Sequence, residues 1–293
     1  MDNSTSKEKV EVKKTSTGNK ENAYEIENVV RVQNYTGEGY KLRDSRPETG
    51  QLAEENREEI EEAVQQFFLK KYKTEVIVHN MVGAVDGASV FVESVGEPHF
   101  YTFAIVGIDV KNETVELDNF WSQEGQVEYA INGGLYAMAF EEEFLVLDEY
   151  LERMTKEYPI VGIPIEAIEN VKATGFATSY YSITPLGDVF KQLFEVYLKN
   201  PDITKQELKS YFIEKNINPE RLVIPIEFYM EDENIKPDKE IFDKLVADIE
   251  KMKGIPQGAY SIYLNDNLID KRRGIGMKDN TLERTTPNKI VKD

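Results

Sequence analysis

The chain has 293 residues, of which 40% are hydrophobic and 30% are charged, a composition that supports a packed core and argues against wholesale disorder. It carries 54 acidic against 35 basic side chains, and the net charge of −19 argues against nucleic-acid binding through bulk electrostatics. Because the chain has no cysteine and two histidines, it forms no disulfide or thiolate metal site and offers little for histidine-based catalysis.

The two ends of the chain differ in composition from its centre. Residues 1–23 are rich in Ser, Thr, Lys, Glu and Asn, and such a segment cannot bury enough surface to offset the entropy of ordering it, so we predict a flexible tether. Residues 271–293 hold seven basic and three acidic side chains and few large apolar ones, which predicts a flexible basic tail. The centre, 24–270, keeps 23 basic and 47 acidic residues, so we expect the globular part to carry a charge of about −24.

The first predicted elements are a long helix and a meander of strands. Residues 52–71 repeat apolar side chains at helical spacing, which places them on one face. Segments rich in β-branched and aromatic residues follow at 74–82, 88–95, 100–110 and 114–121. Short polar connections between them suit antiparallel hairpins. We therefore expect an α+β architecture that begins with a helix packed on a four-strand antiparallel meander.

The second half of the chain mixes helices and strands. Helices are predicted at 135–158, 187–198, 204–216 and 237–254, and strands at 174–184, 222–230 and 259–264. Thr204 and Glu207 have the spacing of a capping box, while Pro225 assigns its strand to a sheet edge or a bulge. Because the order of elements changes after residue 187, we predict two α+β lobes, 24–165 and a mixed lobe at 166–270.

Several groups of polar residues are candidates for metal binding or catalysis. His79 and His99 fit positions in a sheet, since neither has a clear carboxylate partner at ligand spacing. The consecutive Glu141–Glu143 point around a helix rather than into one pocket. A carboxylate pair suited to glycoside hydrolysis needs two acids on facing elements, and the sequence does not say which face of the sheet its acids occupy. These acids are Asp109, Asp118 and Glu128.

Turn and aromatic motifs have ordinary structural interpretations. Asn265–Asn267 indicates a polar turn, because the alternate oxygen ligands of a calcium-binding loop do not follow it. Gly274–Gly276 follows no predicted strand and opens no helix, which argues against a phosphate-binding loop. Trp121 and the pair Tyr180–Tyr181 could line a groove, although strand alternation places one residue of an adjacent pair in the core. Lys271–Arg273 could contact an anionic lipid or wall polymer, or belong to an unstructured tail.

Three stretches carry a resemblance to a known family. Residues 29–42 (VVRVQNYTGEGYKL), 54–71 (EENREEIEEAVQQFFLKK) and 272–284 (RRGIGMKDNTLER) resemble a domain-of-unknown-function family of lipoproteins from bacilli and staphylococci, both Gram-positive. The resemblance covers most of the chain from Tyr24 onward and supplies no catalytic residues. It implies an exported protein that a lipid on an N-terminal cysteine holds at the outer face of the cell membrane.

The chain itself has no cysteine, which leaves two interpretations of its N-terminus. In the first, Met1 follows a removed signal peptide and a lipidated cysteine. In the second, Met1 is the true start of a cytoplasmic protein.

These observations favour a surface-tethered lipoprotein domain with a non-catalytic binding or envelope role. Its partner would be an extracellular ligand or envelope component, with membrane contact only through the lipid anchor and no nucleic acid. From the sequence we assign no catalytic, cofactor-binding or metal-binding residue and expect no cofactor. Two alternatives remain: a carboxylate-dependent hydrolase of a cell-wall polymer, and a cytoplasmic acidic inhibitor that mimics nucleic acid.

Overall fold

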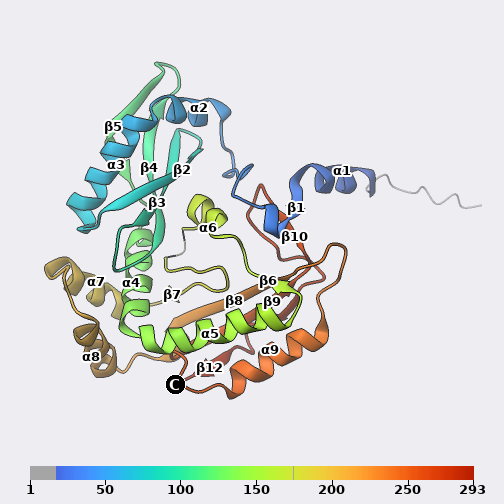
Figure 1. The fold of residues 1–293 in the computed structure, drawn as a ribbon. Helices are drawn as coiled ribbons and strands as arrows, with labels where there is room; N and C mark the ends of the chain where they lie inside the picture. Colours follow the sequence, from blue (N-terminus) through green and yellow to red (C-terminus); the bar gives the residue numbers. More distant parts are fainter. Residues whose placement is uncertain (1–17, 174) are drawn as a thin grey trace, which may run out of the picture.

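The computed structural model describes residues 18–173 and 175–293, and its architecture is α+β, as the sequence predicts (Figure 1). The predicted meander is confirmed as an antiparallel sheet in the order β2-β3-β4-β5. Its strands are β2 (Val76–Gly83), β3 (Gly87–Ser94), β4 (Tyr101–Asp109) and β5 (Thr114–Trp121). The helix predicted at 52–71 is two helices, α2 (Pro47–Glu55) and α3 (Arg57–Tyr72), which pack on this sheet. Asn56 separates them, and its side-chain amide donates to the Leu52 carbonyl at 2.8 Å.

The meander buries one face against α3 because its residues alternate. Ile60, Val64 and Phe68 of α3 are fully buried in the main core. Val90 and Val92 of β3 belong to the same core, so the residues between and after them, including Glu93, point to the opposite face of the sheet. That face is covered by α6 (Ile165–Val171), which packs on β2 and β3 and lies between the two sheets in Figure 1.

The helix predicted at 135–158 is also longer and broken. It consists of α4 (Gln126–Ala139) and α5 (Glu141–Glu157). Apolar and small residues cover α4 on nearly all sides, as a helix enclosed by neighbours requires. Its neighbours include α7 (Val189–Lys199) and α8 (Lys205–Lys215), and the predicted capping box of α8 is confirmed in both directions.

A second, mixed sheet is organised around two parallel strands, β8 (Leu222–Met230) and β9 (Gly258–Asn265). The helix α9 (Lys239–Lys251) connects them, which makes a β-α-β unit. Antiparallel strands complete the sheet: β6 (Ile160–Val161) and β7 (Thr184–Pro185) beside β8, and β11 (Leu282–Arg284) and β12 (Ile290–Lys292) beside β9.

The edge position predicted from Pro225 is wrong, because β8 lies inside the sheet. On the side of β8 away from β9, Glu227 donates its N–H to the Tyr180 carbonyl. Pro225 lies two residues before Glu227, so its backbone faces the same side of β8. The N–H that proline lacks would point toward the segment around Tyr180, and the hydrogen bonds between β8 and β9 are not affected. The strand predicted at 174–184 differs as well: its described residues make isolated bridges and only β7 at the end.

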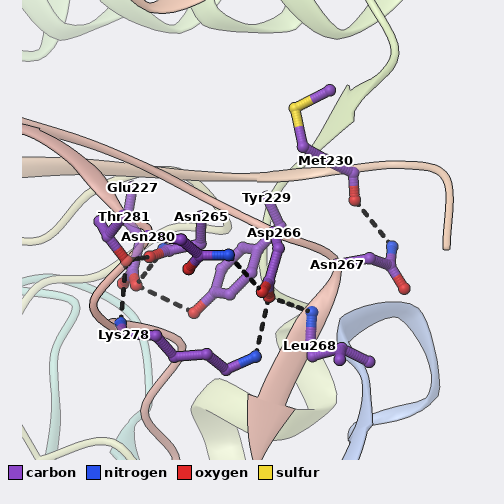
Figure 2. A network of polar contacts seen from close by, with 10 residues as sticks. All are labelled: Glu227, Tyr229, Met230, Asn265, Asp266, Asn267, Leu268, Lys278, Asn280 and Thr281. Carbon is purple, nitrogen blue, oxygen red and sulfur yellow. Dashed lines mark hydrogen bonds and ion pairs between the residues drawn. The ribbon is translucent and has the colours of Figure 1, made fainter. Parts of the chain in front are cut away.

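The C-terminal segment differs from the predicted flexible tail, because β11 and β12 both pair with β9. Polar contacts at the turn after β9 hold it in place, as Figure 2 shows. Asp266 accepts a hydrogen bond from Lys278 Nζ at 2.8 Å, and buried Asn265 accepts one from the Thr281 hydroxyl at 2.7 Å. A Cβ at Gly276 would overlap the buried ring of Tyr229, so this segment packs closely on β8.

The N-terminal segment is attached to the same region. Residues 1–17 of the predicted tether lie outside the described residues, and the remainder begins α1 (Gly18–Asn28). Next, β1 (Val29–Arg31) pairs with β10 (Leu268–Asp270), beside which it lies in Figure 1. A short 3-10 helix, Val32–Asn34, follows β1, and another, Pro219–Arg221, precedes β8.

One hydrophobic cluster joins the two predicted lobes. It contains Leu135 from before the predicted border and Leu193 from after it, both fully buried. A smaller cluster joins Val32 and Tyr35 of the N-terminal segment to Ile168 of α6 and Ile269 of β10. Across the described ranges, no helix has both the length and the apolar composition needed to cross a bilayer.

We expect Asn267→Ala to lower the free energy of unfolding by about 1–3 kcal/mol, because the carbonyl of buried Met230 loses the amide that donates to it. Asn267 is 1% exposed, and its amide donates to the carbonyls of Met230 and Glu231 and to Gln33 Oε1. Chemical denaturation measures the change. The matched control is Asn280→Ala, because exposed Asn280 contacts the same turn through Asp266. Equal losses for both variants would contradict the role given to the buried amide.

Candidate functional site

A pocket of about 620 Å³ lies where the two ends of the chain meet the four-stranded sheet. Its lining comes from residues 36–41 and 45–47 of the N-terminal loop, from 80–83 of β2, and from Gly50, Asn170 and Arg272. All five residues of TGEGY, 36–40, which belong to the first of the three stretches that carry the family resemblance, line this pocket. We call it the loop pocket.

Hydrogen bonds from three directions fix the wall of the loop pocket. Lys41 donates its backbone N–H to the Arg272 carbonyl at 3.1 Å, which joins the N-terminal loop to the C-terminal segment. Asn170 of α6 donates its side-chain amide to the Thr36 carbonyl at 2.8 Å. Asn80 of β2 in turn donates to the Asn170 carbonyl at 3.0 Å. The loop, α6, β2 and the C-terminal segment are thus held in one arrangement.

Gly37 allows the loop to lie directly on α6. Its φ is +93°, a conformation that glycine adopts without steric cost. A Cβ at this position would stand 2.7 Å from Asn170 Cβ and 3.0 Å from Val171 Cγ1, so no larger residue fits the present geometry.

The loop pocket gathers basic side chains in a strongly acidic protein. Lys41, Arg46 and Arg272 line it together with a single carboxylate, Glu38. Arg46 pairs with Asp86 at 3.3 Å, but both side chains are more than half exposed, and such pairs contribute little. Lys41 and Arg272 are exposed and pair with no carboxylate among the described residues. The pocket can therefore offer positive charge to an anionic ligand.

A second polar site lies on the face of the sheet covered by α6. Glu93 of β3 accepts a hydrogen bond from His79 Nε2 on Oε2 and another from His99 Nε2 on Oε1, both at 2.8 Å. Glu169 of α6 brings a second carboxylate: one ligand atom each from His79, Glu93 and Glu169 lie within 4.8 Å of one another. We call these four residues the His–Glu cluster.

The surroundings favour the ionised form of Glu93. Burial opposes ionisation, but the hydrogen bonds from His99 and His79 outweigh it and hold the pKa of the Glu93 carboxyl below its usual value. Next to the cluster, burial and then the charges of Glu93 and Glu169 raise the pKa of the Tyr101 hydroxyl, so this group stays protonated. The His–Glu cluster therefore presents carboxylate oxygens beside two imidazole rings.

This convergence cannot be seen in the sequence because it depends on the register of the strands. Glu93 pairs with Tyr101 across β3 and β4 and with Ile77 across β2 and β3. His99 and His79 each lie two residues from these partners, and the register of β2 shifts between Val78 and Asn80, next to His79. The alternation of β3 places Glu93 on the face opposite the core, and the two hairpins place residues near His79 and His99 beside it. These two signals could have identified Glu93 as their partner. Glu169 comes from α6, for which no helix was predicted.

The other acidic candidates lie apart on separate elements. Asp109 closes the β4–β5 turn, where it accepts from the backbone of Lys111 and Asn112. Asp118 is exposed on β5, and Glu128 lies on α4. In the glutamate run, Glu141 and Glu143 turn toward α8 and pair with lysines at 2.7 and 2.8 Å. These lysines are Lys205 and Lys209.

The turn motifs have structural roles, and the aromatic residues line pockets outside the loop pocket. Asn265–Asn267 is the polar turn after β9. The glycines of 274–276 allow close packing on Tyr35 and Tyr229. Tyr181 is buried and Tyr180 is half-buried, although residues 175–183 form no strand, and both line a small pocket beside β8. Trp121 is 39% exposed and lines a pocket beside β4 and β5. The basic run 271–273 contributes Arg272 to the loop pocket.

We expect Gly37→Ala to destabilise the protein by more than the roughly 1–2 kcal/mol that a positive φ costs an L-residue, because the methyl group also collides with α6. Gly254→Ala is the matched control, since Gly254 has a φ of +78° and nothing within 4 Å of an added Cβ. Thermal and chemical denaturation compare the two variants. A cost for Gly37→Ala no larger than that of the control would mean that the loop moves freely away from α6.

Comparison with known proteins places the chain in a family. The model of the family described as a protein of unknown function, DUF1672, matches residues 22–292. A crystal structure of a DUF1672 family protein from Staphylococcus aureus subsp. aureus Mu50 has the same fold, with a TM-score of 0.73 at 18% identity. The match covers 91% of this chain and 98% of that one. No curated protein matches the chain. This protein belongs to the DUF1672 family.

Proposed function

We propose that the protein is a non-catalytic binding domain that a lipid anchor holds at the outer face of the cell membrane. Its ligand, in this proposal, is an anionic component of the envelope that binds in the loop pocket. The observation that carries the proposal is the meeting of Lys41, Arg46 and Arg272 in one recess of a chain whose net charge is −19.

The contrast between the loop pocket and the rest of the protein supports selective binding. An acidic body repels anions over most of its surface, so an anionic ligand gains contact only where basic side chains are gathered. The same lining offers neutral hydrogen-bonding groups, the hydroxyls of Thr36 and Ser45. A polymer that alternates phosphodiester and hydroxyl groups matches both features.

The chemistry of the pocket favours binding over turnover. Among the described side chains that line it, Glu38 is the one carboxylate, and there is no histidine. Two facing carboxylates, which the hydrolase alternative requires, are not supplied there. The basic lining also gives no support to an inhibitor whose acidic surface mimics nucleic acid.

The location at the membrane is supported by the resemblance of residues 29–42, 54–71 and 272–284 to the lipoprotein family. The ligand site would then face the polymers that lie outside the membrane, where an anionic envelope component is accessible.

The location predicts a lipidated protein in the native host. Expressed from its own locus, the protein should partition into detergent, and its intact mass should exceed that of the chain by an acylated cysteine. The readouts are phase separation and mass spectrometry of the intact protein. An unmodified chain in the aqueous phase would contradict the proposed anchor and leave the binding proposal to be judged separately.

The ligand proposal predicts binding of short poly(glycerol phosphate) but not of neutral dextran of similar length. The double variant Lys41→Gln, Arg272→Gln should weaken binding by roughly 30-fold, from about 1 kcal/mol for each basic group near an anionic ligand. Isothermal titration calorimetry at low and moderate salt measures the affinities. Added salt should weaken the wild-type interaction.

The control for this test is the double variant Lys156→Gln, Lys191→Gln, which removes two exposed lysines on α5 and α7 and causes the same change in net charge. We expect it to bind like the wild type. If both double variants lose affinity equally, binding reflects net charge and the loop pocket is not the site.

A further inference from the structure

We propose that His79, Glu93 and Glu169 bind a divalent transition-metal ion of the zinc type, with His99 holding Glu93 in position. This site lies outside the loop pocket lining and does not rest on the proposed function. It uses both histidines of the chain, which come from separate parts of the sequence to the same glutamate.

The spacing of the donor atoms fits a shared ion. One atom each from His79, Glu93 and Glu169 lie within 4.8 Å of one another. Nitrogen and oxygen ligands bind zinc at ~2.0–2.2 Å, so the ligand atoms around it lie roughly 3–4 Å apart. Shifts of about an ångström or less therefore convert the present hydrogen-bonded arrangement into a coordination shell.

The hydrogen bond between His79 and Glu93 already aligns two of these donors. His79 Nε2 and Glu93 Oε2 face each other at 2.8 Å. In the tautomer that carries its proton on Nδ1, the Nε2 lone pair and Oε2 are directed toward the same region. A cation can then replace the proton between them, and Glu169 supplies a third ligand from α6.

The charge of the site matches a divalent ion. Glu93 and Glu169 bring two carboxylates to a partly buried position, where unpaired negative charge is costly. Within the described ranges, Glu93 makes ion pairs with the two histidines alone, and Glu169 makes none. A divalent ion would neutralise both carboxylates while the imidazole stays neutral.

His99 has the geometry of a positioning residue. It donates to Glu93 Oε1, the oxygen that faces away from His79, at 2.8 Å. Its ring is held edge-on against Tyr101 and Phe176, with centroids 5.0 and 5.9 Å away. Partners of this kind fix the orientation of metal ligands.

The donor set selects the class of metal. One imidazole with two carboxylates suits zinc and similar first-row ions, whereas calcium and magnesium are held by oxygen ligands alone. With no cysteine in the chain, the softer thiolate-bound states are excluded. Open positions in the coordination shell would be filled by water or by a ligand.

The test uses the untagged, metal-free protein, titrated with Co²⁺ and then with Zn²⁺. We expect one Co²⁺ per chain with visible d–d absorption, displacement by Zn²⁺, and a shift of the His79 imidazole signals in NMR spectra on Zn²⁺ binding. Because the chain has only two histidines, both sets of signals are assigned by single substitutions. Mg²⁺ and Ca²⁺ should not displace Co²⁺ at equal concentration.

Variants locate the ion. Glu169→Gln should weaken Zn²⁺ binding by at least about tenfold, the lower end of what the loss of a supporting contact costs. The matched control is Glu166→Gln, an exposed residue on the same helix with the same change in charge, and it should bind Zn²⁺ like the wild type. Glu93→Gln and His79→Gln should abolish the Co²⁺ spectrum. Arg272→Gln, in the loop pocket, should leave it unchanged.

Each result either supports or overturns the site. Unfolding curves without metal show which variants are folded, and Glu169→Gln carries the test if the others are not, because Glu169 is only partly buried. Zn²⁺ binding that leaves the imidazole signals unchanged, or that Glu169→Gln and Glu166→Gln lower equally, would place the ion on the acidic surface and overturn the proposal. The absence of Zn²⁺ binding would overturn it as well.

Discussion

The buried side chain of Asn267 is the point at which the two ends of the chain meet. Its side-chain amide donates to the Met230 carbonyl at the end of β8, and its side-chain oxygen, Oδ1, accepts from Arg31 Nε of β1 at 3.2 Å. The backbone adds to this, since Val32 donates its N–H to the Asn267 carbonyl at 2.8 Å. An unpaired polar group is costly at this depth, so the buried side chain of Asn267 favours the arrangement in which β1 and the end of β8 both contact it.

The loop pocket follows from that junction. Because β1 and β10 are antiparallel, the loop after β1 and the segment after β10 leave from opposite ends of this short pair, and the two segments meet again beyond it. Tyr35 then reaches the Lys271 carbonyl, and Lys41 reaches the Arg272 carbonyl. Basic residues that are more than 200 positions apart in sequence thereby line one recess. A site of this kind depends on the assembled fold and not on any local motif.

The sequence predicts elements whose signals are local. The four strands of the meander and the capping box of Thr204 depend on residues a few positions apart, and the structure confirms them. The ordered structure of residues 271–293 does not depend on local signals. Few apolar residues mark this segment, and it is ordered by contacts with a distant turn, among them Lys278 to Asp266 and Thr281 to Asn265. A composition-based prediction does not detect such contacts.

The same distinction explains the candidate sites. His79 lies in β2 and His99 lies just before β4, and neither position alone reveals that both side chains contact Glu93. Their convergence follows from the hairpin registers and a shift in β2, and Glu169 is added by the packing of α6. Arg272 belongs to a basic run that is visible in the sequence. Its position in the same pocket as Lys41 depends on the pairing of β1 with β10. The sequence therefore shows which residues could take part in a site, but it does not show which of them lie together in the folded protein.

In the proposed function, the N-terminal loop and the C-terminal segment together form one anionic-ligand site. Hydrogen–deuterium exchange mass spectrometry, with and without poly(glycerol phosphate), tests it most directly. We expect the ligand to slow exchange in 36–46 and in 271–276 together, with little change in α5 and α9. Protection of only one of these segments, or of a different face of the protein, would contradict it.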